Sequence, residues 1–323
     1  MPAGAPRWGG WTPPDERRAI SVSGVLGDAW QTYRRAFGPL VFIGAVLGLL
    51  VVLLGLPNEV YLVRMVDSMF HLFMDAGSSN GIYDPILLQS QLEAITRMPS
   101  GLAVVIAVAG GASVGLSLLG TCVLTAAAMT ARAGRRVSPP VAVAAVLSHG
   151  SALILPAVIL ALGSIAVTLP IELASQDIRD AQLSASSGGI SSSGWLTIAS
   201  IVVACAAFYL SVRWCLAIPA ILAERIGLRA GLGRSSRLTH GHRLRLGLAF
   251  VVVGFLQAVT VGLPSIVVGF VLAVSAGSAA AGIAAFALVA VVGNALWAPV
   301  GAAIAAVAYG TLTDDATGPA PAT

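Results

Sequence analysis

The chain contains no lysine and little charge of any kind. Only 10% of its 323 residues are charged, whereas a soluble domain carries about 25%. A protein surface that faces water needs more charge than this. The 57% hydrophobic content and the mean hydropathy of +0.90 indicate an integral membrane protein instead.

Cysteine is scarce, and familiar catalytic motifs are absent. Cys122, Cys205 and Cys215 all fall in apolar stretches, where cysteine behaves as a small hydrophobic residue. No pair of them is spaced for a metal or a disulfide framework. The sequence has no phosphate-cradling loop, nucleophile elbow or HExxH motif, and no carboxylate pair inside an apolar stretch. We therefore predict a protein that is not an enzyme and that uses no metal and no cofactor.

Long apolar stretches are what the sequence has in abundance. A helix that crosses a bilayer needs about 20 apolar residues. Candidate spans lie near residues 39–57, 101–131, 151–171, 195–222, 246–275 and 280–312. Only the small-residue run 275–282 separates the last two, and we predict a tight outer turn there; a re-entrant segment is the alternative. The predicted fold is an all-α integral membrane protein with six transmembrane helices.

The arginines predict which loops face the cytosol. Fourteen of the 18 cations precede the first span or lie between spans two and three or spans four and five. The loops on the opposite side hold only Arg64, Arg97 and Arg179, together with eight acidic residues. The positive-inside rule then places both termini in the cytosol of a multi-pass protein in the cell membrane. The basic inner face should attract anionic lipid headgroups.

Short helices are predicted on this side before spans one, three and five. Residues 21–37 repeat apolar side chains at helical spacing, with Arg34 and Arg35 beside the apolar stripe. Such an amphipathic helix suits the membrane interface. Similar segments occur at 141–147 and 228–238.

The membrane domain is predicted to cover residues 21–312. A disordered cytosolic tail at 1–20 precedes it, and a short cytosolic tail at 313–323 follows. Within the domain, Gly111 and Gly115 form a small-xxx-small pair that lets helices approach closely. Prolines are expected to kink several spans, either for packing or to open a path; they are Pro156, Pro219, Pro264 and Pro299.

Arg213 lies inside the fourth predicted span, shortly before Pro219. A cation within the bilayer costs about 3 kcal/mol on insertion scales. No acidic residue lies inside the other five spans to pair with it, so the candidate partners are Gln257, Asn294, carbonyls freed near Pro219, or a phosphate. Two interpretations stay open: a side chain that snorkels to the cytosolic interface, or a ligand for a lipid phosphate or another anion.

Two segments carry a family resemblance: RWCLAIPAILAE at 213–224 and RSSRLTHGHR at 234–243. They resemble the membrane domain associated with glycerophosphoryl diester phosphodiesterases, a bacterial six-span family. In that family an arginine, a proline and a glutamate end a span, and an Arg-Ser pair, a leucine, a glycine and a basic residue follow. Residues 21–35 resemble the start of the family, and residues 298–309 fit its end loosely. The acidic-basic string usual after that end is reduced here to Asp314 and Asp315.

The resemblance covers about residues 20–312 and implies a stand-alone membrane module. The catalytic domain of some members is a separate soluble barrel, for which this chain has no room. The resemblance also implies signature positions that shape the end of span four and the helix after it. These positions are Arg213, Pro219, Glu224, Arg234, Ser235, Gly241 and Arg243.

The predicted function is a non-enzymatic membrane module that engages anionic headgroups of the cytosolic leaflet or organises partner proteins. No nucleic-acid partner is expected. The candidate headgroup contacts are Arg213, Arg234, Arg237 and Arg243. The alternative is a transporter or channel for a small or lipid-like solute, which kinked spans would suit. A third interpretation is a lipid-directed enzyme, whose titratable groups would be Arg213, Glu224, His240 and His242.

Overall fold

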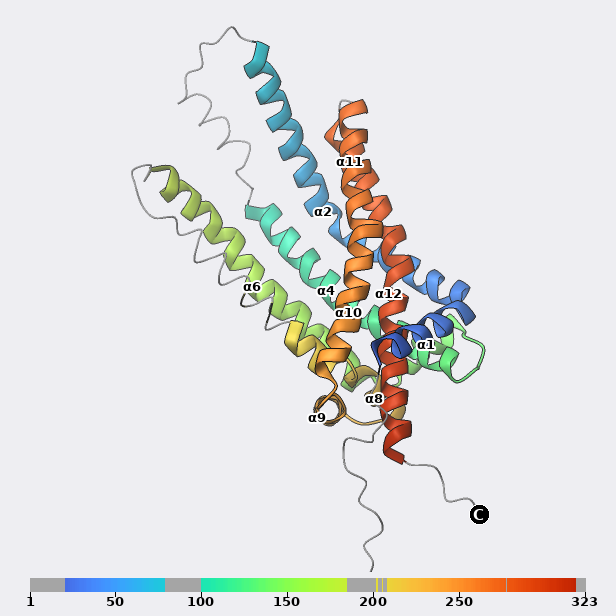
Figure 1. The fold of residues 1–323 in the computed structure, drawn as a ribbon. Helices are drawn as coiled ribbons and strands as arrows, with labels where there is room; N and C mark the ends of the chain where they lie inside the picture. The colour runs from blue at the N-terminus through green and yellow to red at the C-terminus, as the bar shows by residue number, and fades with distance from the viewer. Residues whose placement is uncertain are drawn as a thin grey trace, which may run out of the picture.

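The structure is a computed structural model that describes residues 21–78, 100–184, 202, 205, 208–276 and 278–317. Every regular element in these residues is helical (Figure 1), which confirms the predicted all-α class. The elements are α1 (Val22–Arg35), α2 (Phe37–Ser78), α4 (Ser100–Arg132), α5 (Pro139–Leu147), α6 (Gly150–Ser184), α8 (Ala217–Glu224), α9 (Leu228–Leu238), α10 (Arg243–Gln257), η2 (Ala258–Gly262), α11 (Leu263–Ala276) and α12 (Ala279–Thr317). Residues 208–214 are helical as well.

Four helices in the described residues are long and apolar enough to cross a membrane. They are Phe37–Met65 of α2, Gly101–Arg132 of α4, Arg243–Ala273 through α10 and α11, and Ala280–Thr313 of α12. Helices α5 and α6, bent by 85° at their junction, add a fifth if they form one span. Six spans are therefore not confirmed. Part of the predicted fourth span, 195–222, lies outside the described residues. Of the rest, 208–214 are helical, and a turn at 215–216 separates them from α8.

The short helices gather at one end of the bundle. Figure 1 shows α1, α8 and α9 near the C-terminal end of α12, whereas α2 ends and α11 passes into α12 at the opposite end. We call the first of these the arginine-rich end; it comprises α1, the last turn of α4, the α4–α5 loop (133–138), residues 213–227 including α8, then α9, the start of α10 and the last turns of α12. The predicted cytosolic arginines of the described residues lie on these elements. Helices are present at all three places where short ones were predicted, while their position in the interface stays a prediction.

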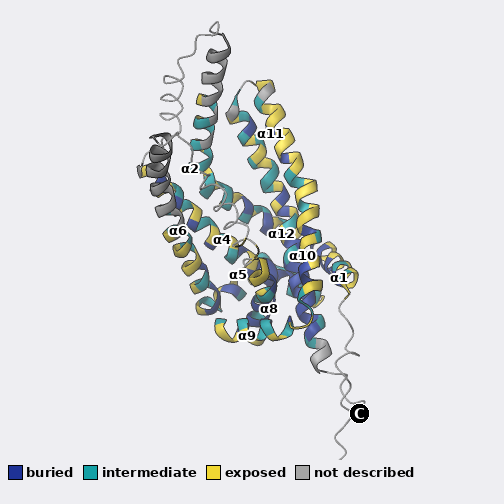
Figure 2. Cartoon of the chain, turned by 60° about the vertical axis from the view of Figure 1, so that its left-hand side comes forward, coloured by how far each residue is buried: buried dark blue, intermediate teal, exposed yellow. Residues whose placement is uncertain are grey.

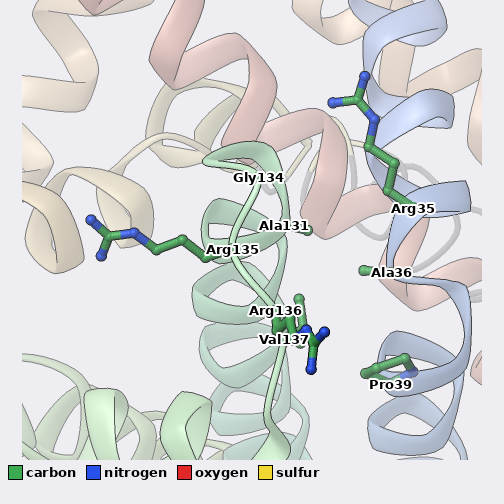
Figure 3. Close-up of a pocket in the computed structure, with 8 residues that line it drawn as sticks. All are labelled: Arg35, Ala36, Pro39, Ala131, Gly134, Arg135, Arg136 and Val137. Carbon is green, nitrogen blue, oxygen red and sulfur yellow. The ribbon is translucent and has the colours of Figure 1, made fainter.

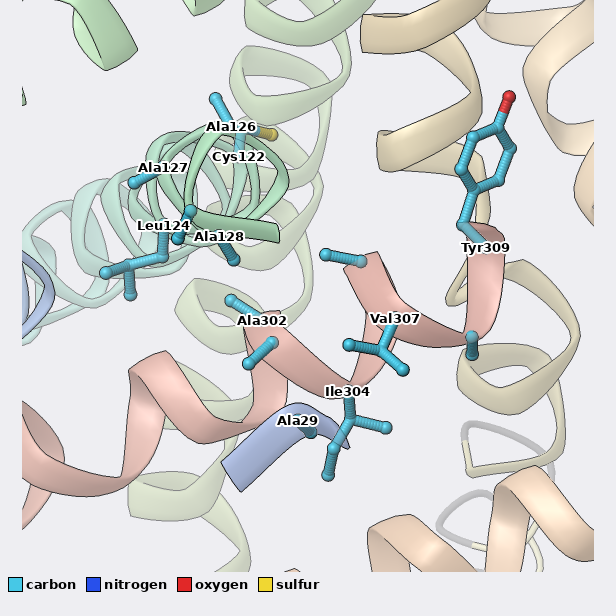
Figure 4. Close-up of a cluster of buried hydrophobic side chains, with 14 of the residues drawn as sticks. Ala29, Cys122, Leu124, Ala126, Ala127, Ala128, Ala302, Ile304, Val307 and Tyr309 are labelled. Atoms are coloured by element: carbon cyan, nitrogen blue, oxygen red, sulfur yellow. The ribbon is translucent and has the colours of Figure 1, made fainter. Parts of the chain in front are cut away.

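The buried core also lies at this end. Figure 2 shows buried residues concentrated there, while the surface of α10 and α11 is largely exposed. Residues 302–310 of α12 are buried without interruption, and five of them are alanines. Small side chains let α1 and α4 pack closely around α12. Figure 4 shows Ala29 of α1 and Ala128 of α4 beside this part of α12.

Most other apolar side chains of the spans face outward. Leu155, Ile159, Phe255 and Phe270 are each more than half exposed. Burying such side chains against one another gains little in a membrane, because lipid tails are as apolar as leucine. The exposed apolar faces are therefore what a lipid-embedded bundle requires.

Two helix junctions follow from proline chemistry. Ser21 caps the start of α1, where its hydroxyl accepts a hydrogen bond from the Gly24 amide at 3.0 Å, and Ala36 caps the end of the helix. Pro39 lies in the first turn of α2, where a missing amide hydrogen is harmless, so α2 can start directly after Ala36. Pro264 has no amide hydrogen to donate, and just before it the backbone hydrogen-bonding pattern changes from α-helical to π-helical in η2.

Gly111 and Gly115 of α4 face α6, in line with the predicted close packing. A Cβ atom on Gly111 would lie 2.6 Å from the Ala161 carbonyl oxygen, and one on Gly115 would lie 3.1 Å from the Ala157 carbonyl oxygen. Gly110, the preceding residue, has no atom within 4 Å of that position. These neighbouring glycines therefore provide a matched pair for a packing test.

We expect Gly111→Ala to lower the apparent melting temperature in detergent, because α4 and α6 must move apart. Gly110→Ala should leave it unchanged or raise it slightly, since alanine favours a helix over glycine by about 1 kcal/mol. The apparent melting temperatures of both variants are measured by size-exclusion chromatography of samples heated to a series of temperatures. Equal shifts in the two variants would contradict the observed helix contact.

Candidate functional site

A break in the helix before Pro219 organises the residues singled out in the sequence. The helix that includes residues 208–214 ends in a turn at Cys215 and Leu216, and α8 starts at Ala217. Pro219 lies in the first turn of α8, where no amide donor is needed, and is fully buried. A helix end leaves backbone groups without partners in the ladder. The groups freed here include the Arg213 carbonyl and the Leu216 amide.

Ser235 of α9 supplies those partners. Its buried hydroxyl donates to the Arg213 carbonyl at 2.9 Å and accepts from the Leu216 amide at 3.2 Å. Gly231, one turn earlier on α9, contacts Ile221 of α8 with no room for a larger side chain. Ser235 therefore ties α9 to the helix break, which gives this signature position a structural role.

Arg213 is half-buried, and its partner also lies on α9. Its Nε donates to the Ser236 hydroxyl at 3.0 Å. The amides of Gln257 and Asn294, considered from the sequence as partners of Arg213, lie 3.3 Å from each other instead. Because α9 belongs to the arginine-rich end, this contact directs the Arg213 side chain toward that end, and both interpretations of Arg213 stay predictions.

Glu224 joins α8, α9 and α12. Its Oε1 accepts a hydrogen bond from the Arg234 Nε at 2.9 Å and another from the Tyr309 hydroxyl at 2.8 Å. Burial alone would raise the pKa of Glu224, but the hydrogen bonds from Tyr309 and Arg234 and the charges of Arg234 and Arg237 lower it overall. The carboxylate is therefore ionised at neutral pH. Sequence reasoning missed Tyr309, although it ends the segment 298–309 that carries part of the resemblance.

The remaining signature residues shape the turn into α10. Gly241 has a φ of +85°, in the left-handed region that suits glycine. The Arg243 Nη1 donates to the Tyr209 hydroxyl at 2.8 Å, and its guanidinium carbon lies 5.8 Å from the ring centroid. Arg237 is exposed in the last turn of α9. Of the four candidate headgroup contacts, three thus bond to protein side chains, and Arg237 remains exposed to an external ligand.

We call these contacts of α8 and α9 the α8–α9 framework. Three cavities lie among the described helices. The first, about 490 Å³, lies between the start of α2 and the α4–α5 loop. The second, about 290 Å³, lies between the ends of α4 and α12 and is lined in part by Arg132 and Tyr309. The third, about 210 Å³, lies between α2, α4 and α12 beside Asn294. None of these three is lined by Arg213.

Among the described residues, no group of three or more His, Cys, Asp and Glu side chains is arranged to hold a metal ion. The site that the structure builds is therefore one of arginines, hydroxyl groups and a single carboxylate.

Residues 189–320 match the family described as the membrane domain of glycerophosphoryl diester phosphodiesterase. The resemblance seen in the sequence is confirmed over this segment, which contains the helix break, α8, α9 and Tyr309. Together with the apolar helices, the match identifies a membrane protein. No curated protein and no solved structure matches the chain.

Ser235→Ala should destabilise the protein more than Ser236→Ala. The first change removes both hydrogen bonds to the helix break and leaves a buried amide without its partner, at a cost of about 1–3 kcal/mol. The second removes one bond to a half-buried guanidinium that water or a headgroup can satisfy, at a cost of about 1 kcal/mol or less. Apparent melting temperatures in detergent give the order, and a lower value for Ser236→Ala would contradict the role of Ser235.

Proposed function

We propose that this chain is a non-enzymatic membrane module whose arginine-rich end binds headgroups of anionic lipids in the cytosolic leaflet. The observation that carries the proposal is the excess of arginine at this end. Its described arginines are Arg34, Arg35, Arg132, Arg135, Arg136, Arg213, Arg225, Arg229, Arg234, Arg237, Arg243 and Arg245. The acidic residues on the same elements are Asp28, Glu224, Asp314 and Asp315.

These arginines fall into two groups, according to whether they bond to protein side chains or are exposed. Arg213, Arg234 and Arg243 bond to protein side chains and hold α9 and α10 in place. Exposed arginines on the same segment are the headgroup contacts; they are Arg225, Arg229 and Arg237. Each cation near an anionic leaflet contributes about 1 kcal/mol of attraction, so several together produce a lasting preference for acidic lipid.

The same proposal orients the protein. Lipid phosphates of the cytosolic leaflet surround the arginine-rich end, and both termini lie in the cytosol of a cell with this protein in its plasma membrane. The apolar outer surfaces of the spans face the acyl chains. The framework of Glu224, Arg234 and Tyr309 keeps the basic helix α9 against the bundle, where its exposed arginines meet the headgroups.

A transporter or channel for a small or lipid-like solute is the second candidate. One observation favours it: the cavity of about 210 Å³ between α2, α4 and α12 is lined by the polar side chains Ser117, Thr121 and Asn294 as well as by apolar residues. A solute path would require water to reach this cavity from one side of the membrane. The first proposal needs no such path.

Cysteine labelling distinguishes the two candidates. In a variant whose native cysteines are replaced, Thr121→Cys should not react with a membrane-impermeant maleimide in liposomes, because the proposed module keeps its interior dry. Arg225→Cys, at an exposed position of the arginine-rich end, is the positive control and should react. Ready labelling of position 121 from one side would support the transporter instead.

Replacing the three exposed arginines should lower the share of acidic lipid around the protein. We expect the triple variant Arg225→Gln, Arg229→Gln, Arg237→Gln to co-purify with a lower ratio of anionic to zwitterionic lipid, because about 3 kcal/mol of summed attraction is lost. Quantitative lipid analysis after mild detergent extraction measures this ratio. Arg64→Gln, an exposed arginine of α2 far from this end, is the control, and an unchanged ratio in the triple variant would refute the proposal.

A further inference from the structure

The cavity of about 490 Å³ at the arginine-rich end lies apart from the α8–α9 framework. It forms where α1 turns into α2 and where α4 leads into the α4–α5 loop. Figure 3 shows its lining residues, which are Arg35, Ala36, Pro39, Ala131, Gly134, Arg135, Arg136 and Val137. Three of the eight are arginines and none is acidic. The charge of this cavity therefore favours an anion.

The arginines of this cavity differ from those of the α8–α9 framework. Arg35, Arg135 and Arg136 are all exposed. Within the described residues, none of their side chains forms a hydrogen bond or an ion pair. Figure 3 shows their guanidinium groups pointing away from one another, with that of Arg135 turned away from Ala36 and Pro39, so a shared ligand requires these long, exposed side chains to turn toward it. Within the part of the chain that the structure describes, all of their donors are thus available to a ligand.

Three helix ends meet at this cavity. Helix α2 starts at Phe37, and the Leu40 amide donates to the Ala36 carbonyl at 3.0 Å. Helices α1 and α4 end there, so their negative dipole ends offset the positive end of α2, and the preference for an anion comes from the arginine side chains. Across the cavity, Gly134 adopts a φ of +70° and turns the chain out of α4, which brings Arg135 and Arg136 to the opposite wall.

Exposed aromatic side chains mark the depth of the cavity in the membrane. Trp30, Phe37 and Phe42, on α1 and the start of α2, are 52%, 48% and 60% exposed. Trp30 and Phe37 both contact the ring of Tyr33, with centroids 5.4 and 5.3 Å apart from it. Tryptophan is enriched at the level of lipid headgroups, and exposed phenylalanine is typical of the apolar face of interfacial helices. A cationic cavity beside exposed apolar rings suits a ligand with a phosphate and acyl chains.

We infer that this cavity is a phosphate-binding site in which Arg35, Arg135 and Arg136 hold the phosphate of a lipid headgroup. Guanidinium groups match phosphate oxygens through paired hydrogen bonds. Three cations with no acidic neighbour favour a phosphate monoester, with up to two negative charges, over a singly charged diester. Free phosphate shares this chemistry, whereas only a lipid also contacts Phe37 and Phe42. The site goes beyond the proposed function, because general attraction of acidic lipid needs no defined cavity.

Native mass spectrometry of the full chain in detergent tests the site with three probes. They are short-chain phosphatidic acid, which is a phosphate monoester, short-chain phosphatidylglycerol, which is a diester, and inorganic phosphate. The cavity variant carries Arg35→Gln, Arg135→Gln and Arg136→Gln. The control variant carries Arg225→Gln, Arg229→Gln and Arg237→Gln, which removes the same charge from the same end outside the cavity.

We expect a single phosphatidic acid molecule to bind each chain more tightly than phosphatidylglycerol. Its affinity should fall about tenfold or more in the cavity variant and less than about threefold in the control variant. Arg135→Gln alone, at an exposed position, is a milder second variant with an expected loss of about threefold. Elution of each variant as the wild-type species in size-exclusion chromatography shows that the fold is kept.

Equal losses of affinity in the cavity and control variants would overturn the site, because binding would then depend only on the total charge of the arginine-rich end. The proposed function would not be affected by this result. Unchanged affinity in the cavity variant would also overturn the site. A loss confined to the cavity variant supports the site even if the lipid ratio of the control variant is unchanged and the proposed function fails. Inorganic phosphate that binds as tightly as phosphatidic acid would support the phosphate site and identify free phosphate as its source.

Discussion

Backbone groups released inside a membrane protein must find partners within the protein, because lipid tails offer none. The helix break before Pro219 creates this demand for the Arg213 carbonyl and the Leu216 amide. Ser235 meets it with one hydroxyl from a neighbouring helix. The position of α9 across the end of the bundle follows from this contact, and with it the positions of most arginines between residues 225 and 245.

A second constraint links this end to the centre of the bundle. The Glu224 carboxylate accepts hydrogen bonds from α9 through Arg234 and from α12 through Tyr309. Helix α12 is itself buried over 302–310, where alanines let its neighbours pack closely. The arginine-rich end is therefore joined directly to the buried core of the described chain. Its inward-facing arginines hold the structure together, while its outward-facing ones can meet lipid.

Prediction from sequence succeeded where the signal was local. The helix at 228–238 has the bounds that apolar spacing indicated, and Gly111 and Gly115 pack against α6 as a small-xxx-small pair suggests. The partner of Arg213 could not be predicted in this way. Ser236 is 23 residues away in the chain, and only the fold of α9 brings it near. Tyr309 was missed for the same reason, since 85 residues separate it from Glu224.

Hydropathy and the distribution of arginine determined, from the sequence alone, that the protein is an apolar helical bundle with one basic end. Both properties sum over many residues and need no knowledge of contacts. The tertiary structure alone decided which arginines are engaged and which are exposed. Arg234 and Arg243 bond to protein side chains, while Arg35 and Arg136 line an open cavity. Whether a guanidinium group is paired depends on which side chains lie near it in space. Those side chains meet only after the helices pack.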